Sequence, residues 1–285
     1  MIDNLKKSIS WAFAIISVIF TFVPESFFES IGLVSQAYLD THKHLSWLAA
    51  RDVNIVTSRL ICFGLIWILA SFLYAGRQKF RRHITIKGQN YSIRVEYGDI
   101  LKQKDCKRVI NFDECYTDQV GNATADINPN SICGQYLNAN QNLDIQQLIK
   151  DANVNPEPDG SKYQQKTRYR PGTIVPNGDD LLLAFARLDE RGKGRFFSRD
   201  EYLACLDLLW KELEYHHSQK DVCVPILGAG ATSFDGGSGA SISQQDLLDM
   251  MIWSYRLSSH KIKSPHKLRI ICRKNGDFSI NDIDR

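Results

Sequence analysis

The sequence lacks several features that mark common classes of protein. Its 285 residues contain 7 Cys but no Cys-x-x-Cys pair, and no Gly-Lys-Ser/Thr sequence occurs. The missing Cys pairs argue against a zinc site, because structural zinc sites usually hold closely spaced thiolates. The missing Gly-Lys-Ser/Thr excludes a Walker phosphate loop. With 18 Gly, 8 Pro and 44% hydrophobic residues, the chain is neither collagen-like nor disordered.

A broad excess of basic charge is also missing. The chain has 35 Lys+Arg against 32 Asp+Glu, and residues 88–285 hold 25 basic and 27 acidic side chains. Proteins that bind duplex nucleic acid usually carry a broad basic surface, so we expect no nucleic-acid partner. Basic charge is instead concentrated in one acid-free segment, residues 76–87, which contains five Lys and Arg.

Two uncharged apolar segments precede this basic segment. Residues 8–24 and 60–76 contain no charged side chain, and large apolar residues would occupy all faces of the helices that they form. A bilayer core needs ~20 residues, with a lower limit of ~17. The second segment can begin near residue 56 if Arg59 extends to the membrane interface. We therefore predict transmembrane helices at about 8–24 and 56–76, with a pair of buried core helices as the alternative.

The flanking charges predict the orientation of this hairpin. Two lysines precede the first span, the basic segment follows the second, and residues 24–55 contain few Lys or Arg. The positive-inside rule then places both termini in the cytoplasm. A cleaved signal peptide is the alternative for the first segment, but residues 21–23 are too bulky for a cleavage site. We expect a transmembrane hairpin with a basic linker at 1–82, and a cytoplasmic domain at 83–285, in a multi-pass protein of the inner membrane.

The predicted cytoplasmic domain alternates short β-rich runs with helical patterns, which is typical of a layered α/β fold. Two helices have clear start signals, namely capping boxes that begin at Ser198 and Ser243. Polar or glycine-rich loops are expected at 155–172 and 235–241, and the second has the position of a lid over a ligand. The predicted strands are 83–87, 91–97, 108–112, 173–176, 181–188, 222–227 and 268–273.

A glycine-containing turn follows the predicted strand 222–227. It consists of Gly228, Ala229, Gly230, Ala231 and Thr232. Glycine lets successive backbone N–H groups face one anion, and such a nest at the end of a strand binds phosphate. Ser233 stands where the Rossmann fingerprint requires a third glycine. A plain tight turn is the alternative use of the same residues.

Three strand ends resemble macro-domain signatures, in the order of that family. Asp99 and Ile100 belong to a Gly-Asp-Ile segment, Asn111 ends the next strand, and the turn at 228–232 comes last. The resemblance implies that Asp99 binds adenine, that Asn111 lies near the distal ribose and that the glycine turn holds a diphosphate. It also implies a three-layer α/β/α fold with a mixed sheet.

A further segment, from Ser131 to Gly134, resembles the glycine turn that opens a helix at the diphosphate in the same family. With the paired N-terminal spans, the sequences INFDE, SICGQY, RYRPGT and VPILGAGAT resemble the transmembrane-macro effectors of Thoeris antiphage systems. This resemblance implies a macro domain that senses an ADP-ribose-derived signal made by a TIR-domain enzyme, histidine-conjugated ADP-ribose in type II systems. We therefore expect a ligand sensor rather than an enzyme, with no catalytic residue, cofactor or metal assigned, and with weak hydrolysis left open.

The same resemblance implies that signal binding leads to assembly and membrane damage. Two helices cannot enclose a pore alone, so an effector that permeabilises the bilayer must form homo-oligomers. Two other functions stay open at this point. One is a membrane-tethered ADP-ribosyl hydrolase, and the other is a constitutive membrane-anchored interaction module.

Asp113 and Glu114 depart from the macro-domain pattern. Hydrolases of that family commonly carry Asn-Ala-Ala-Asn where this chain has Asn-Phe-Asp-Glu from Asn111 onward. Either carboxylate can act as a base on water, pair with a cationic group on a conjugated signal, or lie in solvent at a strand end. We favour recognition of the signal. Arg170 is a candidate to grip the diphosphate, with an ordinary exposed loop as the alternative.

Overall fold

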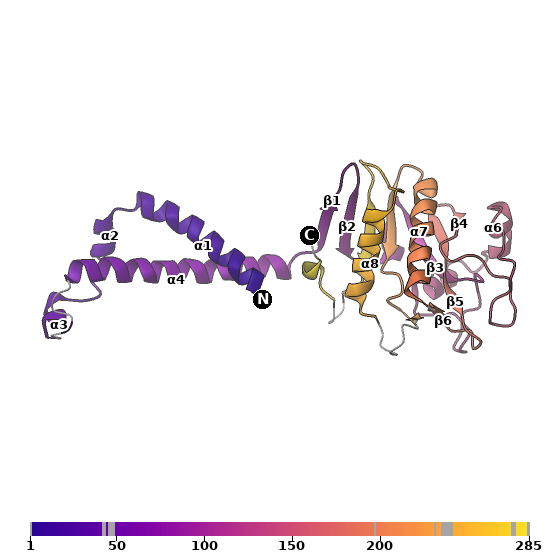
Figure 1. Cartoon of the computed structure of the whole chain (residues 1–285), viewed down its shortest axis with the longest axis horizontal. Coiled ribbons are helices and arrows are strands. Elements are labelled where there is room, and N and C mark those ends of the chain that lie inside the picture. The colour runs from indigo at the N-terminus through magenta and orange to yellow at the C-terminus, as the bar shows by residue number, and fades with distance from the viewer. Residues whose placement is uncertain are drawn as a thin grey trace. The chain divides into compact units, whose positions relative to one another are not determined.

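The chain forms two compact units, Met1–Arg81 and Arg82–Arg285 (Figure 1). The computed structural model describes residues 2–41, 44, 49–196, 198–230, 232–234, 242–274 and 278–283. Within these ranges, the first unit contains helices and turns, and the second contains all of the strands.

The first unit is built on helix α4. Its helices are α1 (Ile2–Phe22), α2 (Glu25–Glu29), α3 (Gln36–Thr41) and α4 (Ala50–Lys79). The rings of Phe13 in α1 and Phe63 in α4 lie with centroids 5.2 Å apart. The Asn54 side chain accepts a hydrogen bond from the Val34 N–H (2.8 Å) and donates one to the Val34 carbonyl (2.9 Å). These contacts fix the segment between α2 and α3 against α4.

Helix α4 is long and apolar enough to cross a membrane. It has 30 residues, and its most apolar window has a mean hydropathy of 2.0 with only 6% of that window buried. The apolar part of α1, Ile9–Phe22, is shorter. Arg59 pairs with Glu25 (Nη2–Oε1 3.2 Å) and lies over the ring of Phe28. One helix therefore meets the requirements of a span by length and composition, while the second span and the orientation stay predictions.

A mixed sheet forms the centre of the second unit. Its strands are β1 (His83–Lys87), β2 (Ser92–Tyr97), β3 (Cys106–Asp113), β4 (Ile174–Asn177), β5 (Asp180–Leu188), β6 (Gly194–Phe196), β7 (Asp221–Pro225), β8 (Ser233–Phe234) and β9 (Leu268–Cys272). They follow the order β1-β2-β9-β7-β3-β5-β6-β8, with β4 also paired to β5. The pairs from β2 through to β5 are parallel, whereas β1–β2, β4–β5 and β5–β6 are antiparallel.

All seven strands predicted from the sequence are confirmed, with some ends moved by one or two residues. The sequence analysis missed β6 and β8. These strands are too short to show an alternating pattern. Arg195 and Phe196 of β6 pair in parallel with Ser233 and Phe234 of β8, and β6 also pairs with β5. Their existence therefore depends on tertiary pairing rather than on a local signal.

Helices cover both faces of the sheet, so the predicted three-layer α/β/α fold is confirmed. Helices α7 (Arg199–His216) and α8 (Gln244–Leu257) share one buried cluster with the sheet, and α5 (Ile132–Ala139) and α6 (Ile145–Asp151) share the other. Strand β5 shows the alternation that this requires. Leu181, Leu183 and Phe185 belong to the α7/α8 cluster, and Leu182 and Ala184 to the α5/α6 cluster.

Both predicted capping boxes start helices where expected. The Ser198 hydroxyl accepts a hydrogen bond from the Glu201 N–H at the start of α7 (3.1 Å), and the Ser243 hydroxyl accepts one from the Asp246 N–H at the start of α8 (3.1 Å). Each bond satisfies a backbone donor that the first helical turn leaves without a partner.

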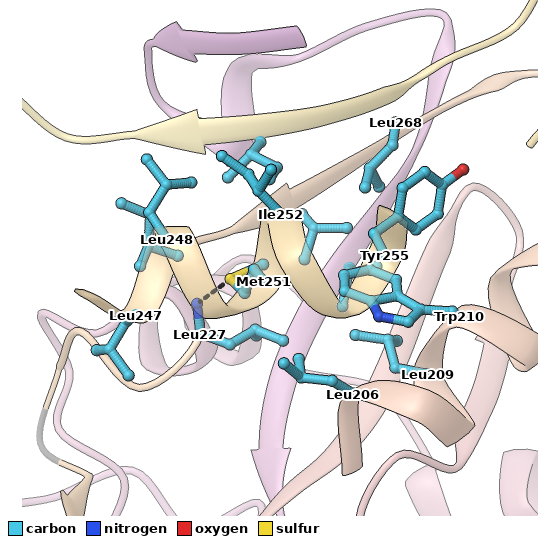
Figure 2. Packing of buried hydrophobic residues seen from close by; sticks show 14 of the residues in the cluster. Leu206, Leu209, Trp210, Leu227, Leu247, Leu248, Met251, Ile252, Tyr255 and Leu268 are labelled. Atoms are coloured by element: carbon cyan, nitrogen blue, oxygen red, sulfur yellow. Dashed lines mark hydrogen bonds between the residues drawn. The ribbon is translucent and has the colours of Figure 1, made fainter. Parts of the chain in front are cut away.

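The packing of α7 against α8 also anchors the loop that follows β7. Figure 2 shows Leu206, Leu209 and Trp210 of α7 facing Met251 and Tyr255 of α8. The rings of Trp210 and Tyr255 lie edge to face with centroids 5.1 Å apart. At the start of the glycine turn, the Leu227 N–H donates to the Met251 sulfur (3.4 Å). The turn therefore begins from a fully packed residue.

Candidate functional site

A cleft of about 680 Å³ lies at the carboxyl ends of the parallel strands in the second unit. Its lining includes residues at or just beyond the ends of four strands: Asp113 at the end of β3, Leu188 at the end of β5, Ile226 after β7 and Arg273 after β9. Ligands in open α/β sheets bind at this edge. The volume lies within the usual range for small-molecule sites, about 300–1,000 Å³.

The predicted glycine turn forms one wall of the cleft. Gly228, Ala229, Gly230 and Thr232 line it, and Ala231 lies outside the described residues. Gly228 has a φ of 86°, and a Cβ there would lie 2.7 Å from the ring of Phe234, so only glycine fits. In the described part of the chain, the N–H groups of Gly228 and Gly230 have no acceptor. They are available to an anion in the cleft.

Asn111 and Asp113 contribute polar groups from the end of β3. Both line the cleft. The Asp113 Oδ1 accepts hydrogen bonds from the N–H groups of Cys115 (2.8 Å) and Thr117 (3.2 Å), which orient the carboxyl group. Burial raises the pKa of Asp113 above its ordinary value. This group can therefore hold a proton at a higher pH than an exposed Asp.

Glu114 does not line the cleft, although it is the next residue in the chain. Its side chain is 1% exposed. Its Oε1 accepts hydrogen bonds from the Ser161 hydroxyl (2.6 Å) and the Leu188 N–H (3.0 Å), and Arg168 lies 3.6 Å from Oε2. These partners place Glu114 under the loop at 155–172, where it ties the loop to the sheet.

The start of α5 forms a second wall. Ser131 and Cys133 line the cleft, and the Ser131 hydroxyl accepts the Gly134 N–H (2.9 Å) as the helix cap. Gly134 itself serves packing, because a Cβ there would lie 2.2 Å from the Asn128 carbonyl. Burial raises the pKa of the Cys133 thiol well above its usual value, so this thiol stays neutral and is a poor nucleophile.

Besides Glu114 and Gly134, three further predicted site residues lie outside the cleft lining: Asp99, Ile100 and Arg170. The Asp99 carboxylate accepts the Leu101 N–H (3.1 Å) at the start of a short 3-10 helix, Ile100–Lys102. Ile100 is buried with Ile271, and Ile271 does line the cleft. Arg170 is exposed and lies on a separate groove with Lys211 and Tyr215 of α7. The structure thus brings together the β3, α5 and glycine-turn residues, but not Asp99 or Arg170.

The sequence analysis missed two cationic side chains of the cleft. Lys193 lies in the turn between β5 and β6, and Arg273 follows β9. Asp126 and Gln244 also line the cleft and were not predicted. The available signal was positional, since Arg273 is the last residue of the predicted strand 268–273, and ligands in open α/β sheets bind at the carboxyl ends of the strands.

The cleft combines backbone donors, two cations and the carboxyl groups of Asp113 and Asp126. Lys193, Arg273 and the N–H groups of the glycine turn can neutralise an anionic centre, while Asn111 and Asp113 offer polar partners beyond it. Among the described residues, no group of three or more His, Cys, Asp or Glu could hold a metal ion. This arrangement fits a ligand with a phosphate centre and polar ends.

Comparisons with known proteins agree on one family. The model of the family "Thoeris protein ThsA, Macro domain" matches residues 93–273. The chain is 28% identical over 247 residues to Thoeris protein ThsA of Bacillus amyloliquefaciens (strain Y2), an alignment that covers 82% of this chain and 79% of that protein.

Solved macrodomains of Oceanobacillus iheyensis are more distant. The macrodomain with ADP is 9% identical, with a TM-score of 0.41, over 68% of this chain and 90% of that one. A variant of it with ADPR is 8% identical, with a TM-score of 0.41, over 68% of this chain and 92% of that one.

Proposed function

Because this chain belongs to the Thoeris protein ThsA macro-domain family, we propose that it is an antiphage effector whose cleft binds an ADP-ribose-derived nucleotide. The observation that carries this proposal is the cleft at the carboxyl ends of β3, β5, β7 and β9, with its glycine turn and two cations. A diphosphate carries negative charge that free backbone N–H groups and Lys or Arg stabilise.

Other residues that line the cleft are suited to bind the ribose end of the nucleotide. Asn111 and Asp113 are suited to hydrogen bonds with ribose hydroxyls or with a group conjugated to the ribose. A cationic imidazolium or amine gains from a nearby carboxylate, so Asp113 favours an amino-acid conjugate such as histidine-conjugated ADP-ribose over plain ADP-ribose. The signal would come from a partner TIR-domain enzyme.

The proposed effect of signal binding is a change in the lipid bilayer. Helix α4 is long and apolar enough to span it, and signal binding would drive protomers to associate and disrupt the membrane. Moving a closed-to-open ratio from 99:1 to 1:99 requires ~10⁴-fold tighter binding to the open state. A nucleotide that contacts the glycine turn, two cations and the β3 end makes enough contacts for such a preference.

Gly230→Glu in the full chain tests the proposal. A Cβ at Gly230 meets nothing within 4 Å, so the fold should tolerate the change, while the new carboxylate repels a diphosphate. We expect the variant to lose the rise in melting temperature on adding the nucleotide, and to lose protection against phage. Gln146→Glu on the exposed face of α6 adds the same charge and should keep both. Equal nucleotide response in the two variants would contradict the proposal.

Hydrolysis of an ADP-ribosyl bond is a second candidate function, favoured by Asp113. A buried carboxyl group with a raised pKa in a ligand cleft has the properties of a general base or acid. Mass analysis of the nucleotide after incubation separates the two functions. An unchanged mass favours the sensor, and product formation that disappears in Asp113→Asn favours the hydrolase.

A further inference from the structure

One edge of the second unit carries no acidic residue in sequence. Residues 82–95 contain three Lys and Arg, residues 256–274 contain seven, and neither segment contains Asp or Glu. The fold brings the two segments together, because β2 pairs with β9 and Tyr91 forms a β-bridge with Lys263. The two acid-free segments therefore form one basic side of the sheet.

Part of this charge is used within the protein. Arg94 and Arg269 both pair with Glu96, and Lys261 caps the end of α8 through the Tyr255 and Ser258 carbonyls. Four other cations, Lys87, Arg256, Lys263 and Lys267, lie near the end of β1, the start of β9 or the end of α8. Arg273 and Lys274 follow β9 at its opposite end.

Among the described residues, these four cations form no ion pair with a carboxylate, although the charge of Lys263 attracts that of Glu214. Lys87, Arg256 and Lys263 are exposed and Lys267 is half-buried. Two carboxylates lie nearby, but both have partners. Glu214 pairs with His260 (2.7 Å), and Asp221 accepts the Lys267 backbone N–H (3.1 Å).

Large apolar side chains lie beside these cations on α8. Trp253 is 53% exposed and Leu257, one turn later, is 81% exposed. The Arg256 guanidinium lies 4.4 Å from the centroid of the Trp253 ring. The end of α8 reaches the β1–β2 turn through Tyr255, whose ring lies 5.7 Å from that of Tyr91. Exposed Trp and Leu among Lys and Arg are typical of surfaces that enter the headgroup layer of a membrane.

We propose that this surface binds the anionic lipid headgroups of the bilayer. We call it the basic edge, and it consists of Lys87, Trp253, Arg256, Leu257, Lys263 and Lys267. The inference rests on the membrane location in the proposed function. Only Phe80, Arg81 and Arg82 separate α4 from β1, and three residues span at most about 11 Å. If α4 is embedded in the membrane, this short linker ties the second unit to the bilayer and keeps the local concentration of lipid high.

Lipid is favoured over nucleic acid as the occupant. Exposed Leu257 gains from an acyl-headgroup boundary but not from a phosphodiester backbone, and the tether supplies a high local concentration of lipid. Residues 88–285 carry more acidic than basic side chains, which disfavours a long polyanion that wraps the domain.

Lysine acetylation of the full chain in lipid nanodiscs tests the basic edge. The discs contain phosphatidylcholine with or without phosphatidylglycerol, and no nucleotide. Each Lys at an anionic surface gains about 1 kcal/mol, which is ~5-fold in occupancy. We expect acetylation of Lys87, Lys263 and Lys267 to slow by ~5-fold with phosphatidylglycerol, and to recover in high salt because salt screens the attraction. Lys211, exposed on α7, is the internal control.

A charge-reversed variant provides the second readout. In Lys87→Glu/Lys263→Glu, acetylation of Lys267 should become equal in the two lipids, whereas Lys211→Glu should leave the difference intact. Equal rates in both lipids for the unmodified chain would overturn the basic edge and leave nucleotide binding untouched. Slower acetylation of these lysines with added RNA, but not with phosphatidylglycerol, would also overturn the proposal.

A separate measurement tests whether the chain is embedded in the membrane. A chain that carbonate washes from the discs would contradict the membrane part of the proposed function. The same labelling, repeated with phosphatidylglycerol vesicles, would then decide whether the basic edge binds lipid: slower acetylation supports it, and unchanged acetylation overturns it.

Discussion

Asp113 and Glu114 are adjacent in the chain, yet their carboxylates lie in different environments. Successive side chains along a strand point to opposite faces, and the register between β3 and β5 also shifts between Phe112 and Asp113. Asp113 lines the cleft, whereas Glu114 accepts hydrogen bonds from Ser161 and Leu188 inside the protein. One carboxylate is therefore available to a ligand and the other holds a loop in place.

Stability should depend on the protonation of Asp113. Burial raises its pKa in the folded protein, so the folded state binds more protons than the unfolded chain above about pH 4. The free energy of unfolding then falls as the pH rises through the folded-state pKa, and is constant above it. Asp113→Asn removes this loss and keeps an oxygen for the Cys115 and Thr117 N–H groups. We expect the variant to gain stability relative to wild type across this pH window.

Urea unfolding at a series of pH values, followed by tryptophan fluorescence, measures this difference. Asp118→Asn, at an exposed position, is the control and should give a curve parallel to wild type. A parallel curve for Asp113→Asn as well would show that the Asp113 pKa is not raised in the folded state.

The loop at 155–172 should depend on the bond between Ser161 and Glu114. Ser161→Ala removes the 2.6 Å hydrogen bond to a carboxylate that is 1% exposed. Leaving a buried polar group without its partner costs about 1–3 kcal/mol. We expect a fall of this size in the free energy of unfolding, measured in urea. Thr167→Ala in the same loop changes an exposed side chain and should cost almost nothing, so equal midpoints for the two variants would refute the role of Glu114.

The two glycines of the cleft turn should respond differently to alanine. Gly228 has a φ of 86° and would place a Cβ 2.7 Å from Phe234, whereas Gly230 has open space around its Cβ position. Gly228→Ala should destabilise the protein by about 1–3 kcal/mol, and Gly230→Ala should stay within about 0.5 kcal/mol of wild type. Thermal unfolding without nucleotide checks this pair. Similar losses for both would mean that the turn is packed differently.

Arg273 should contribute to nucleotide binding through charge. It lines the cleft after β9, and a hydrogen bond between charged groups contributes about 1.5–3 kcal/mol, or a 10- to 100-fold change in Kd. We expect Arg273→Ala to weaken nucleotide binding by a factor in this range in calorimetry. Lys211→Ala removes a cation from α7, outside the cleft lining, and should leave the Kd unchanged.

Local signals in the sequence predicted most of the fold. Ser198 and Ser243 start their helices because each capping bond forms within four neighbouring residues, and β5 was visible because its apolar run is buried on both faces. Strands β6 and β8 were not predictable, since they are stabilised by each other across a long stretch of chain.

The candidate site was predictable only in part, for a similar reason. The glycine turn and Asn111 carry family motifs and do line the cleft. The partners that hold Glu114 inside the protein, Ser161 and Leu188, lie far from it along the chain, and neither contact is visible in a local pattern. Lys193 and Arg273 carry no motif, and only the assembled sheet brings them to the same edge.

The melting temperature of the full chain, with NAD, ADP-ribose or histidine-conjugated ADP-ribose and with mass analysis of each ligand, tests the central claim most directly. A ligand at 100-fold its Kd stabilises by ~2.7 kcal/mol, and a domain of this size gains ~2–4 °C per kcal/mol. We predict a rise of about 5–10 °C with the conjugated nucleotide and no change in its mass. No rise with any of the three would contradict nucleotide sensing by this cleft.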